Sequence, residues 1–143
     1  FDLADASCWE AVGNQYTGEL RIDGARRTVG DLQHWARSIR ASAVKPLSFF
    51  PTGCVQLCHD ECMALSMMAA GQAEDAEAGL LAAEFVTGVK DRAALQEVWH
   101  AARHFAAALQ AAGQVMYPVP CAVIRTIHMM QQAIQPPASQ TLN

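Results

Sequence analysis

The stretch RAALQEVWHAARHFAAALQAAG, residues 92–113, decides the fold class of this protein. Its apolar side chains recur at spacings of three and four residues, the period of an α-helix that buries one face. The residues on this face are Leu95, Val98, Trp99, Ala102, Phe105, Ala106 and Leu109. Asp91 is a good N-terminal cap for such a helix, and Gly113 is suited to its end. We therefore predict a long helix here, at the centre of a helical fold.

The rest of the chain repeats the helical pattern between glycine and proline residues. We expect further helices over residues 5–16, 29–42, 52–70 and 74–87, and from Pro120 to Ile134. A β signal occurs in GELRIDGARRTVG, where Leu20 and Ile22 alternate with charged residues beside the turn-forming pair Asp23-Gly24. The sequence thus predicts an all-α bundle of five or six helices with a short β-hairpin at residues 19–29.

The composition is that of a single soluble domain. The chain has 143 residues, of which 52% are hydrophobic and only 7% aromatic, which is typical of helical proteins. Every apolar run is broken well before the ~18 residues that a membrane-spanning helix needs. We expect one helical domain over residues 1–135 and a disordered tail over residues 136–143. Because the chain begins with Phe1, its natural start is missing, so the periplasm stays a candidate compartment beside the favoured cytoplasm.

The segment CVQLCHDEC, residues 54–62, brings three thiols and an imidazole into nine positions. On the helix expected over residues 52–70, Cys54, Cys58 and Cys62 share one apolar face. Such a face resembles, on one helix, the cysteine-lined bundles of copper-storage proteins, and the resemblance implies binding of Cu(I) or another soft metal. Free cysteine also packs as a small apolar side chain. We favour this second interpretation, with reduced thiols, no bound metal and no cofactor.

The histidines provide no catalytic constellation. Glu97, His100 and His104 share the face of the 92–113 helix opposite its apolar side chains, so we expect them to contact water. His128 lies at the edge of an apolar stripe, which favours a hydrogen-bonded histidine at the boundary of the core. The sequence contains no Gly-x-Ser-x-Gly elbow, no Gly-x-Gly-x-x-Gly motif and no Walker loop. We therefore do not expect an enzyme.

One short stretch near the start of the chain resembles part of an enzyme family. The stretch CWEAVGNQY, residues 8–16, resembles the first helix of periplasmic lytic transglycosylases. Those enzymes need a Glu-Ser pair at the end of the following helix. Residues 35–42 read WARSIRAS at that place and contain no glutamate, so the activity is not carried over to this chain.

Basic side chains are concentrated in one part of a chain whose net charge is −4. Residues 21–45 contain six of the ten basic residues and two of the fourteen acidic ones, a local charge of +4 that leaves −8 elsewhere. This pattern favours a surface that binds an acidic partner. The residues that we expect to bind the partner are Arg26, Arg27, Arg37 and Arg40.

The favoured function is therefore protein binding by a small non-catalytic domain of the regulatory, adaptor or inhibitor type. Bacterial immunity proteins, which block a toxin, are an analogy for this class. Two alternatives remain open. One is Cu(I) binding through Cys54, Cys58 and Cys62. The other is weak nucleic-acid binding through the basic residues of segment 21–45, against which the overall acidity of the chain argues.

Overall fold

The computed structural model describes residues 9, 10, 12, 14, 15, 22–50 and 54–134. Its helices are α2 (Ile22–Ser42), α3 (His59–Ala73), α4 (Ala76–Thr87), α5 (Arg92–Ala111) and α6 (Cys121–Ile134). The described ranges contain no strand. The prediction of an all-α protein is confirmed.

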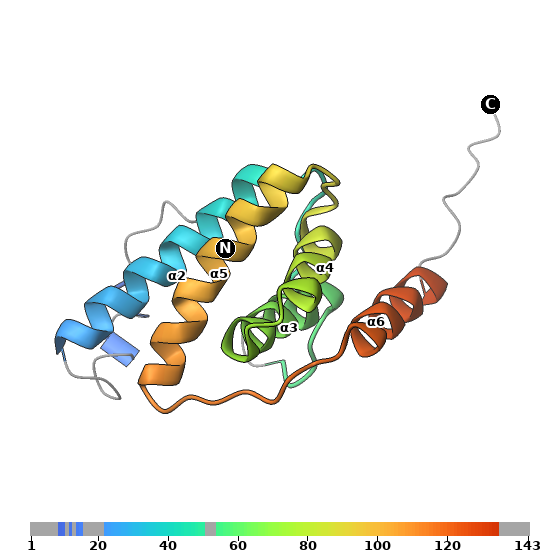
Figure 1. The fold of residues 1–143 in the computed structure, drawn as a ribbon. Helices are drawn as coiled ribbons and strands as arrows, with labels where there is room; N and C mark the ends of the chain where they lie inside the picture. Colours follow the sequence, from blue (N-terminus) through green and yellow to red (C-terminus); the bar gives the residue numbers. More distant parts are fainter. Residues whose placement is uncertain (1–8, 11, 13, 16–21, 51–53, 135–143) are drawn as a thin grey trace.

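The helices form two packed pairs, with α6 added at one side (Figure 1). Helix α2 lies along α5, and α3 lies along α4, while α3 and α4 also pack against α5. Helix α6 contacts α3 and α4 and, within the described chain, neither α2 nor α5. Helix α5 thus has the central place that its sequence predicts, and α6 is peripheral. None of the helices in the described ranges is long and apolar enough to cross a membrane.

Several expectations concern residues outside the described part of the chain. The tail over residues 136–143 and residues 19–21 of the expected hairpin are among them. Of the helix expected over residues 5–16, five residues are described, and all of them are helical. These are Trp9, Glu10, Val12, Asn14 and Gln15. The limits of the expected domain over residues 1–135 stay a prediction.

The hairpin predicted at residues 19–29 is wrong, because α2 already begins at Ile22. The buried stripe of α2 extends back through Thr28 to Ala25. The Thr28 hydroxyl donates to the carbonyl oxygen of Gly24 at 2.9 Å, a bond that threonine makes inside a helix. Burial of this stripe, in a helix that packs along α5, outweighs the local turn preference of the Asp-Gly pair.

Helix α3 begins at His59, so the helix predicted over residues 52–70 is wrong at its start. The backbone N–H of Cys58 donates to a Glu61 carboxylate oxygen at 2.7 Å, which closes the helix end at Cys58. Asp60 and Glu61 place two acids in the first turn, where the helix dipole favours negative charge. The helix also continues past Gly71, the expected stop.

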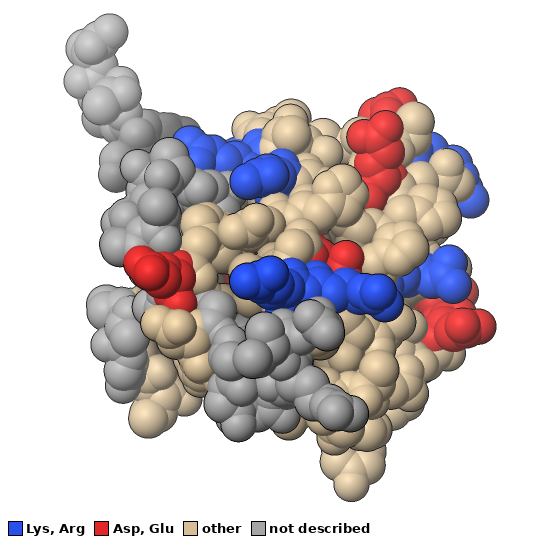
Figure 2. All heavy atoms as spheres, turned by 90° about the vertical axis from the view of Figure 1, so that its left-hand side faces the viewer, with Lys and Arg blue, Asp and Glu red and all other residues tan. Residues whose placement is uncertain are grey.

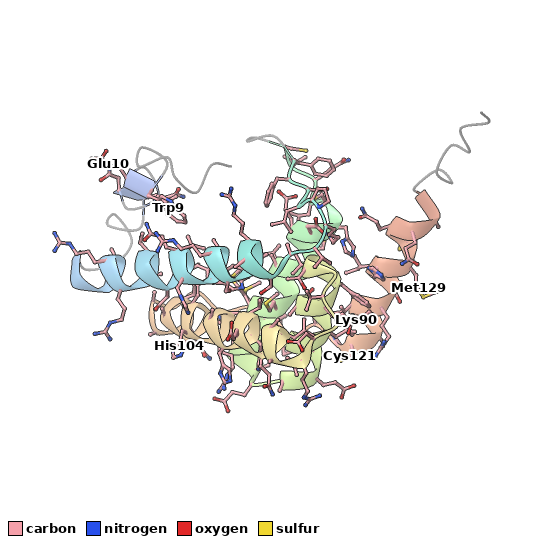
Figure 3. All side chains as sticks on the ribbon, turned by 90° about the horizontal axis from the view of Figure 1, so that it is seen from above. Trp9, Glu10, Lys90, His104, Cys121 and Met129 are labelled. Carbon is pink, nitrogen blue, oxygen red and sulfur yellow. The ribbon has the colours of Figure 1, made fainter. Side chains whose placement is uncertain are left out.

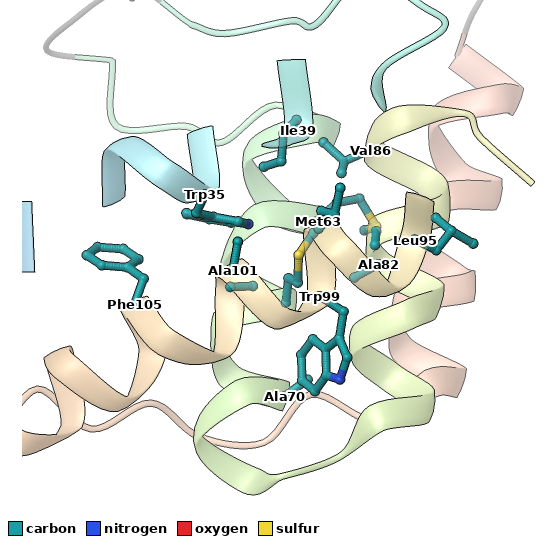
Figure 4. Packing of buried hydrophobic residues seen from close by; sticks show 14 of the residues in the cluster. Trp35, Ile39, Met63, Ala70, Ala82, Val86, Leu95, Trp99, Ala101 and Phe105 are labelled. Atoms are coloured by element: carbon teal, nitrogen blue, oxygen red, sulfur yellow. The ribbon is translucent and has the colours of Figure 1, made fainter. Parts of the chain in front are cut away.

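One hydrophobic core joins all five helices (Figure 4). Met63 and Met67 of α3 are completely buried, and Trp35 of α2 stacks on Phe105 of α5 with ring centroids 5.7 Å apart. Every apolar residue that the sequence assigns to the inner face of the central helix is buried. Asp91 caps this helix as predicted, because its carboxylate accepts the N–H of Ala94 at 2.9 Å.

Two buried glycines allow the helices to approach closely. A Cβ atom at Gly71 would lie 2.7 Å from the Cβ atom of Ala106 on α5. A Cβ atom at Gly79 of α4 would overlap the indole ring of Trp99. Neither position can gain a methyl group without displacing α5 or one of its side chains.

We expect Gly79→Ala to lower the free energy of unfolding by roughly 1–3 kcal/mol, because the new methyl group must displace the buried Trp99 ring. Gly30→Ala is the matched control. A Cβ atom at Gly30 meets nothing within 4 Å, so alanine should stabilise α2 by about 0.5–1 kcal/mol. Urea unfolding monitored by circular dichroism measures both changes. Equal stability of Gly79→Ala and the wild type would contradict the close packing of α4 on α5.

Candidate functional site

The four arginines expected to bind a partner are all exposed on α2: Arg26, Arg27, Arg37 and Arg40. At 100° per residue, Arg26, Arg37 and Arg40 form one stripe along the helix, and Arg27 lies to its side. We call the first three the arginine stripe. No ion pair within the described residues involves any of these arginines. Figure 2 shows basic side chains gathered across this side of the molecule.

An apolar groove of about 910 Å³ lies beside the arginine stripe. Its apolar lining comes from α2, the segment 43–50, α3 and α4, and includes Leu32, Trp35, Ala36, Ile39, Ala43, Leu47, Phe49, Phe50, Ala64 and Val86, with Trp9 from the N-terminal part. Two of these aromatic side chains are unusually open to water, since Phe49 is 58% exposed and Phe50 is 42% exposed. The groove therefore offers an apolar surface that the chain's own helices leave largely uncovered.

The charged side chains in the groove are not equivalent. Arg40 is free of ion pairs among the described residues, whereas the Lys45 ammonium lies 2.8 Å from a carboxylate oxygen of Asp60. Glu61 also lines the groove, and its carboxylate already accepts the backbone N–H of Cys58. The positive charge left without a partner in the groove is therefore that of Arg40, which also belongs to the arginine stripe.

A buried carboxylate holds one wall of the groove in place. Asp60 is 4% exposed, and one of its oxygens accepts the Lys45 ammonium at 2.8 Å, while the other accepts the Ser48 backbone N–H at 2.8 Å. The first oxygen also pairs with Nδ1 of His59 at 2.9 Å. Burial raises the pKa of Asp60, but these three donors outweigh it and hold the pKa below its ordinary value. The ionised carboxylate thus ties the segment 45–48 to α3.

Hydrogen bonding continues from Asp60 through His59 to His128 on α6. Nε2 of His59 lies 2.9 Å from Nδ1 of His128, and Nε2 of His128 lies 3.0 Å from the side-chain nitrogen of Gln132. An ionised carboxylate can only accept, so Nδ1 of His59 carries a proton and its Nε2 is an acceptor. His128 must then donate from Nδ1 and accept the Gln132 amide at Nε2. We call this series the histidine chain.

The histidine chain can relay a proton, but the described residues add no activated nucleophile to it. The Cys58 thiol donates to the backbone oxygen of Ser48 at 3.0 Å, and burial raises its pKa, which opposes formation of a thiolate. The His128 ring stacks on Phe85 with centroids 3.8 Å apart and an angle of 4° between the planes. The arrangement is suited to holding α6 against α3 and α4.

The prediction that Cys54, Cys58 and Cys62 share one apolar helical face is wrong, because α3 begins only at His59. Cys54 is exposed before α3, Cys58 precedes its first residue, and Cys62 lies one turn inside it. Burial also raises the pKa of Cys62. Across the described residues, no group of three or more His, Cys, Asp or Glu side chains is placed to hold a metal ion. The helical face on which the Cu(I) hypothesis depended is therefore absent from the fold.

The other histidine predictions are confirmed. Glu97, His100 and His104 are all exposed on α5, and Figure 3 shows His104 at the outer side of the bundle. His128 is half-buried and hydrogen-bonded at the boundary of the core.

The sequence interpretation missed His59 and Asp60 as a buried pair. Their partners are Lys45, 15 residues before Asp60, and His128, 69 residues after His59. A helix start with two acids in its first turn is the only local signal, and it predicts exposed acids. Burial of Asp60 follows from the segment 45–48 and from α6, neither of which is near it in sequence.

Comparisons of the chain with protein-family models, with curated proteins and with solved structures give no significant match. The groove, the arginine stripe and the histidine chain are therefore the features of the molecule that bear on its function.

We expect Asp60→Asn to lower the free energy of unfolding at neutral pH by roughly 1–3 kcal/mol, because a neutral amide binds Lys45 more weakly and leaves buried donors poorly matched. The folded pKa of Asp60 lies below the ordinary ~3.9 of an aspartate, so its stabilisation is complete above that value. It is lost as the pH falls through the lower, folded pKa. Asp60→Asn should lack this acid-dependent loss.

Urea unfolding at a series of pH values measures both effects. Glu97→Gln is the matched control, since Glu97 is exposed on α5 and has no ion pair among the described residues. This variant should unfold as the wild type does. If Asp60→Asn matched the wild type at every pH, the carboxylate would not hold the groove wall.

Proposed function

We propose that this protein is a non-catalytic binding module that holds an acidic, amphipathic helical segment of a protein partner in the groove beside α2. The observation that carries the proposal is the position of the exposed Phe49 and Phe50 in the same groove as Arg40, whose charge has no partner in the described chain. An apolar groove with exposed aromatic anchors is typical of helix-in-groove recognition.

The apolar part of the groove supplies the affinity. Exposed aromatic side chains lose contact with water when a partner covers them, and such residues dominate the binding energy of many interfaces. Trp35, Leu47 and Ile39 line the groove and are mostly inaccessible, so they form a floor against which partner side chains can pack. A volume of about 910 Å³ is at the upper end of the range for small-molecule sites, which suits several side chains of a peptide.

The arginine stripe supplies the specificity. Arg26 and Arg40 are 14 positions apart on α2, which at ~1.5 Å per residue is about 21 Å. A partner helix of about four turns could align its acidic residues with this stripe while its apolar residues occupy the groove. Long-range attraction to the stripe would also raise the association rate, even though the protein as a whole is acidic.

Nucleic acid is a less suitable occupant of the same surface. Asp60 and Glu61 line the groove, and a phosphate backbone would pass close to both carboxylates. A strand carries a charge at every nucleotide, whereas an amphipathic helix can keep its acids on the arginine stripe and turn apolar residues toward Asp60 and Glu61. We therefore treat nucleic-acid binding as an outcome of the test below. Binding of a soft metal stays a hypothesis that no contact in the described structure favours.

Selection from a displayed library of random short peptides tests the proposal directly. We expect the enriched peptides to be net acidic, with apolar residues at spacings of three and four, and to bind with a dissociation constant in the micromolar range or below. Single-stranded DNA and RNA of comparable length are the second arm. Enrichment of basic peptides, or tighter binding of nucleic acid than of any peptide, would contradict the proposal.

The charge-reversal variant Arg37→Glu/Arg40→Glu should weaken the selected peptide by about tenfold or more, since one pair of favourable contacts becomes repulsive. Phe50→Ala should weaken it to a similar degree by removing an apolar anchor. Arg125→Glu on α6 is the matched control and should bind as the wild type does, because Arg125 is exposed and does not line the groove. Isothermal titration calorimetry gives the affinities, and circular dichroism confirms that each variant is folded. Unchanged affinity of both groove variants would place the binding site elsewhere.

A further inference from the structure

We propose that the hydrogen bond between His59 and His128 is a pH-sensitive clasp, which keeps α6 docked on α3 and α4 at neutral pH and releases it in mildly acidic solution. The clasp does not depend on the proposed function of the groove. It rests on the direction of the hydrogen bonds in the histidine chain and on the small apolar contact of α6.

Besides the clasp, α6 is held by a small apolar contact, in which Cys121 and Ile127 pack against the core beside Ile124. Ile124 is its one completely buried side chain in the described chain, whereas Val123, Met129 and Met130 are 45%, 67% and 60% exposed. Figure 3 shows Met129 on the outer side of the helix. The bond from His128 to His59 is the only side-chain hydrogen bond that joins α6 to another described element. Docking of α6 is therefore sensitive to the loss of one polar contact.

The clasp requires a single proton between its two facing nitrogens. Nε2 of His59 and Nδ1 of His128 are 2.9 Å apart, and one of them must accept. A first added proton can enter at Nε2 of His128 if the Gln132 amide turns its oxygen toward the ring, so the clasp survives it. A second proton places N–H groups on both facing nitrogens. The hydrogen bond is then lost, and two cationic rings lie with centroids 5.0 Å apart.

The surroundings of His128 favour its neutral form. Burial lowers its pKa, and positive charge on His59, Lys45 and Lys90 acts in the same direction. Glu84 on α4 acts in the opposite direction, but its carboxylate is paired with Lys90. On the far side of His59, the Asp60 carboxylate is shared with Lys45.

The sign of the pH dependence follows from this preference. Undocked α6 exposes a histidine with an ordinary pKa near 6.5, whereas docked α6 holds it below that value. The undocked state therefore binds more protons, so docking is strongest above that pH and weakens as the pH falls below it. Asp60 stays ionised at about pH 5, because its folded pKa lies below the ordinary ~3.9. Loss of α6 docking near pH 5 would therefore result from protonation of the histidines and not of Asp60.

Release of α6 would uncover the surface of α3 and α4 beneath it, including the ring of Phe85. The groove lies elsewhere on the bundle, although Asp60 belongs both to its lining and to the histidine chain. A change of pH would thus present a second apolar surface while the groove wall stays bonded through Lys45 and Ser48.

Hydrogen–deuterium exchange of the whole chain, corrected for intrinsic exchange rates, tests the clasp. Between pH 7.5 and about pH 5, we expect the protection of peptides from α6 to fall by about tenfold or more. Protection of peptides from α5 should stay unchanged, which excludes general unfolding. Equal protection of α6 at the two pH values, or a parallel loss in α5, would overturn the proposal.

His128→Phe provides the decisive variant, because phenylalanine can keep the stacking on Phe85 but cannot titrate. In this variant the protection of α6 should be the same at pH 7.5 and at about pH 5. The control His104→Phe, at an exposed site on α5, should lose protection of α6 at the lower pH, as the wild type does. If His128→Phe lost as much protection of α6 at about pH 5 as the wild type does, the proposal of a clasp would be overturned. Should this variant not fold, the ring signals of His59 and His128 in the wild type must show a second protonation over the pH range in which α6 loses protection. Titration in a different range would be equally contrary to the proposal.

Discussion

The buried carboxylate of Asp60 is the constraint on which the groove and the docking of α6 both depend. A charge removed from water must be matched by donors, and Asp60 draws them from the segment 45–48 and from His59. These bonds fix one wall of the groove. Because an ionised carboxylate cannot donate, they also fix which nitrogen of His59 carries a proton, and through it the proton on His128. One side chain thus orders parts of the molecule that are far apart in sequence.

The groove and the docked helix α6 differ in how strongly the rest of the bundle supports them. The groove is supported by α2, which packs along the central helix α5, and by the carboxylate of Asp60. Its exposed Phe49 and Phe50 are the apolar anchors of the proposed interface. Helix α6 sits at the edge of the bundle, with much of its apolar surface in water. The groove is therefore supported by more of the core than α6 is, since Ile124 is the one completely buried side chain of α6 in the described chain.

The sequence interpretation succeeded where the signal is local and repeated. The buried apolar residues of α5 occur over about four turns, and Asp91 caps the helix by a bond to a neighbour three residues away. It failed where a local signal competes with packing. Residues 22–30 contain a good hairpin turn, yet burial of Ala25 and Thr28 continues the helix. The helix expected from residue 52 begins at His59, where the bond between Cys58 and Glu61 closes its end.

The sequence by itself determined the all-α class, the central place of α5 and the outward face of Glu97, His100 and His104. These properties depend on the helical period and on bonds between near neighbours, which the order of residues records directly. Only the tertiary structure decided that Asp60 is buried, that Lys45 and His59 share it, and that His128 completes the chain. These contacts join residues between 1 and 69 positions apart, and the longest of them exist only because α6 returns to α3. No periodicity records such a meeting, since it depends on how the helices pack.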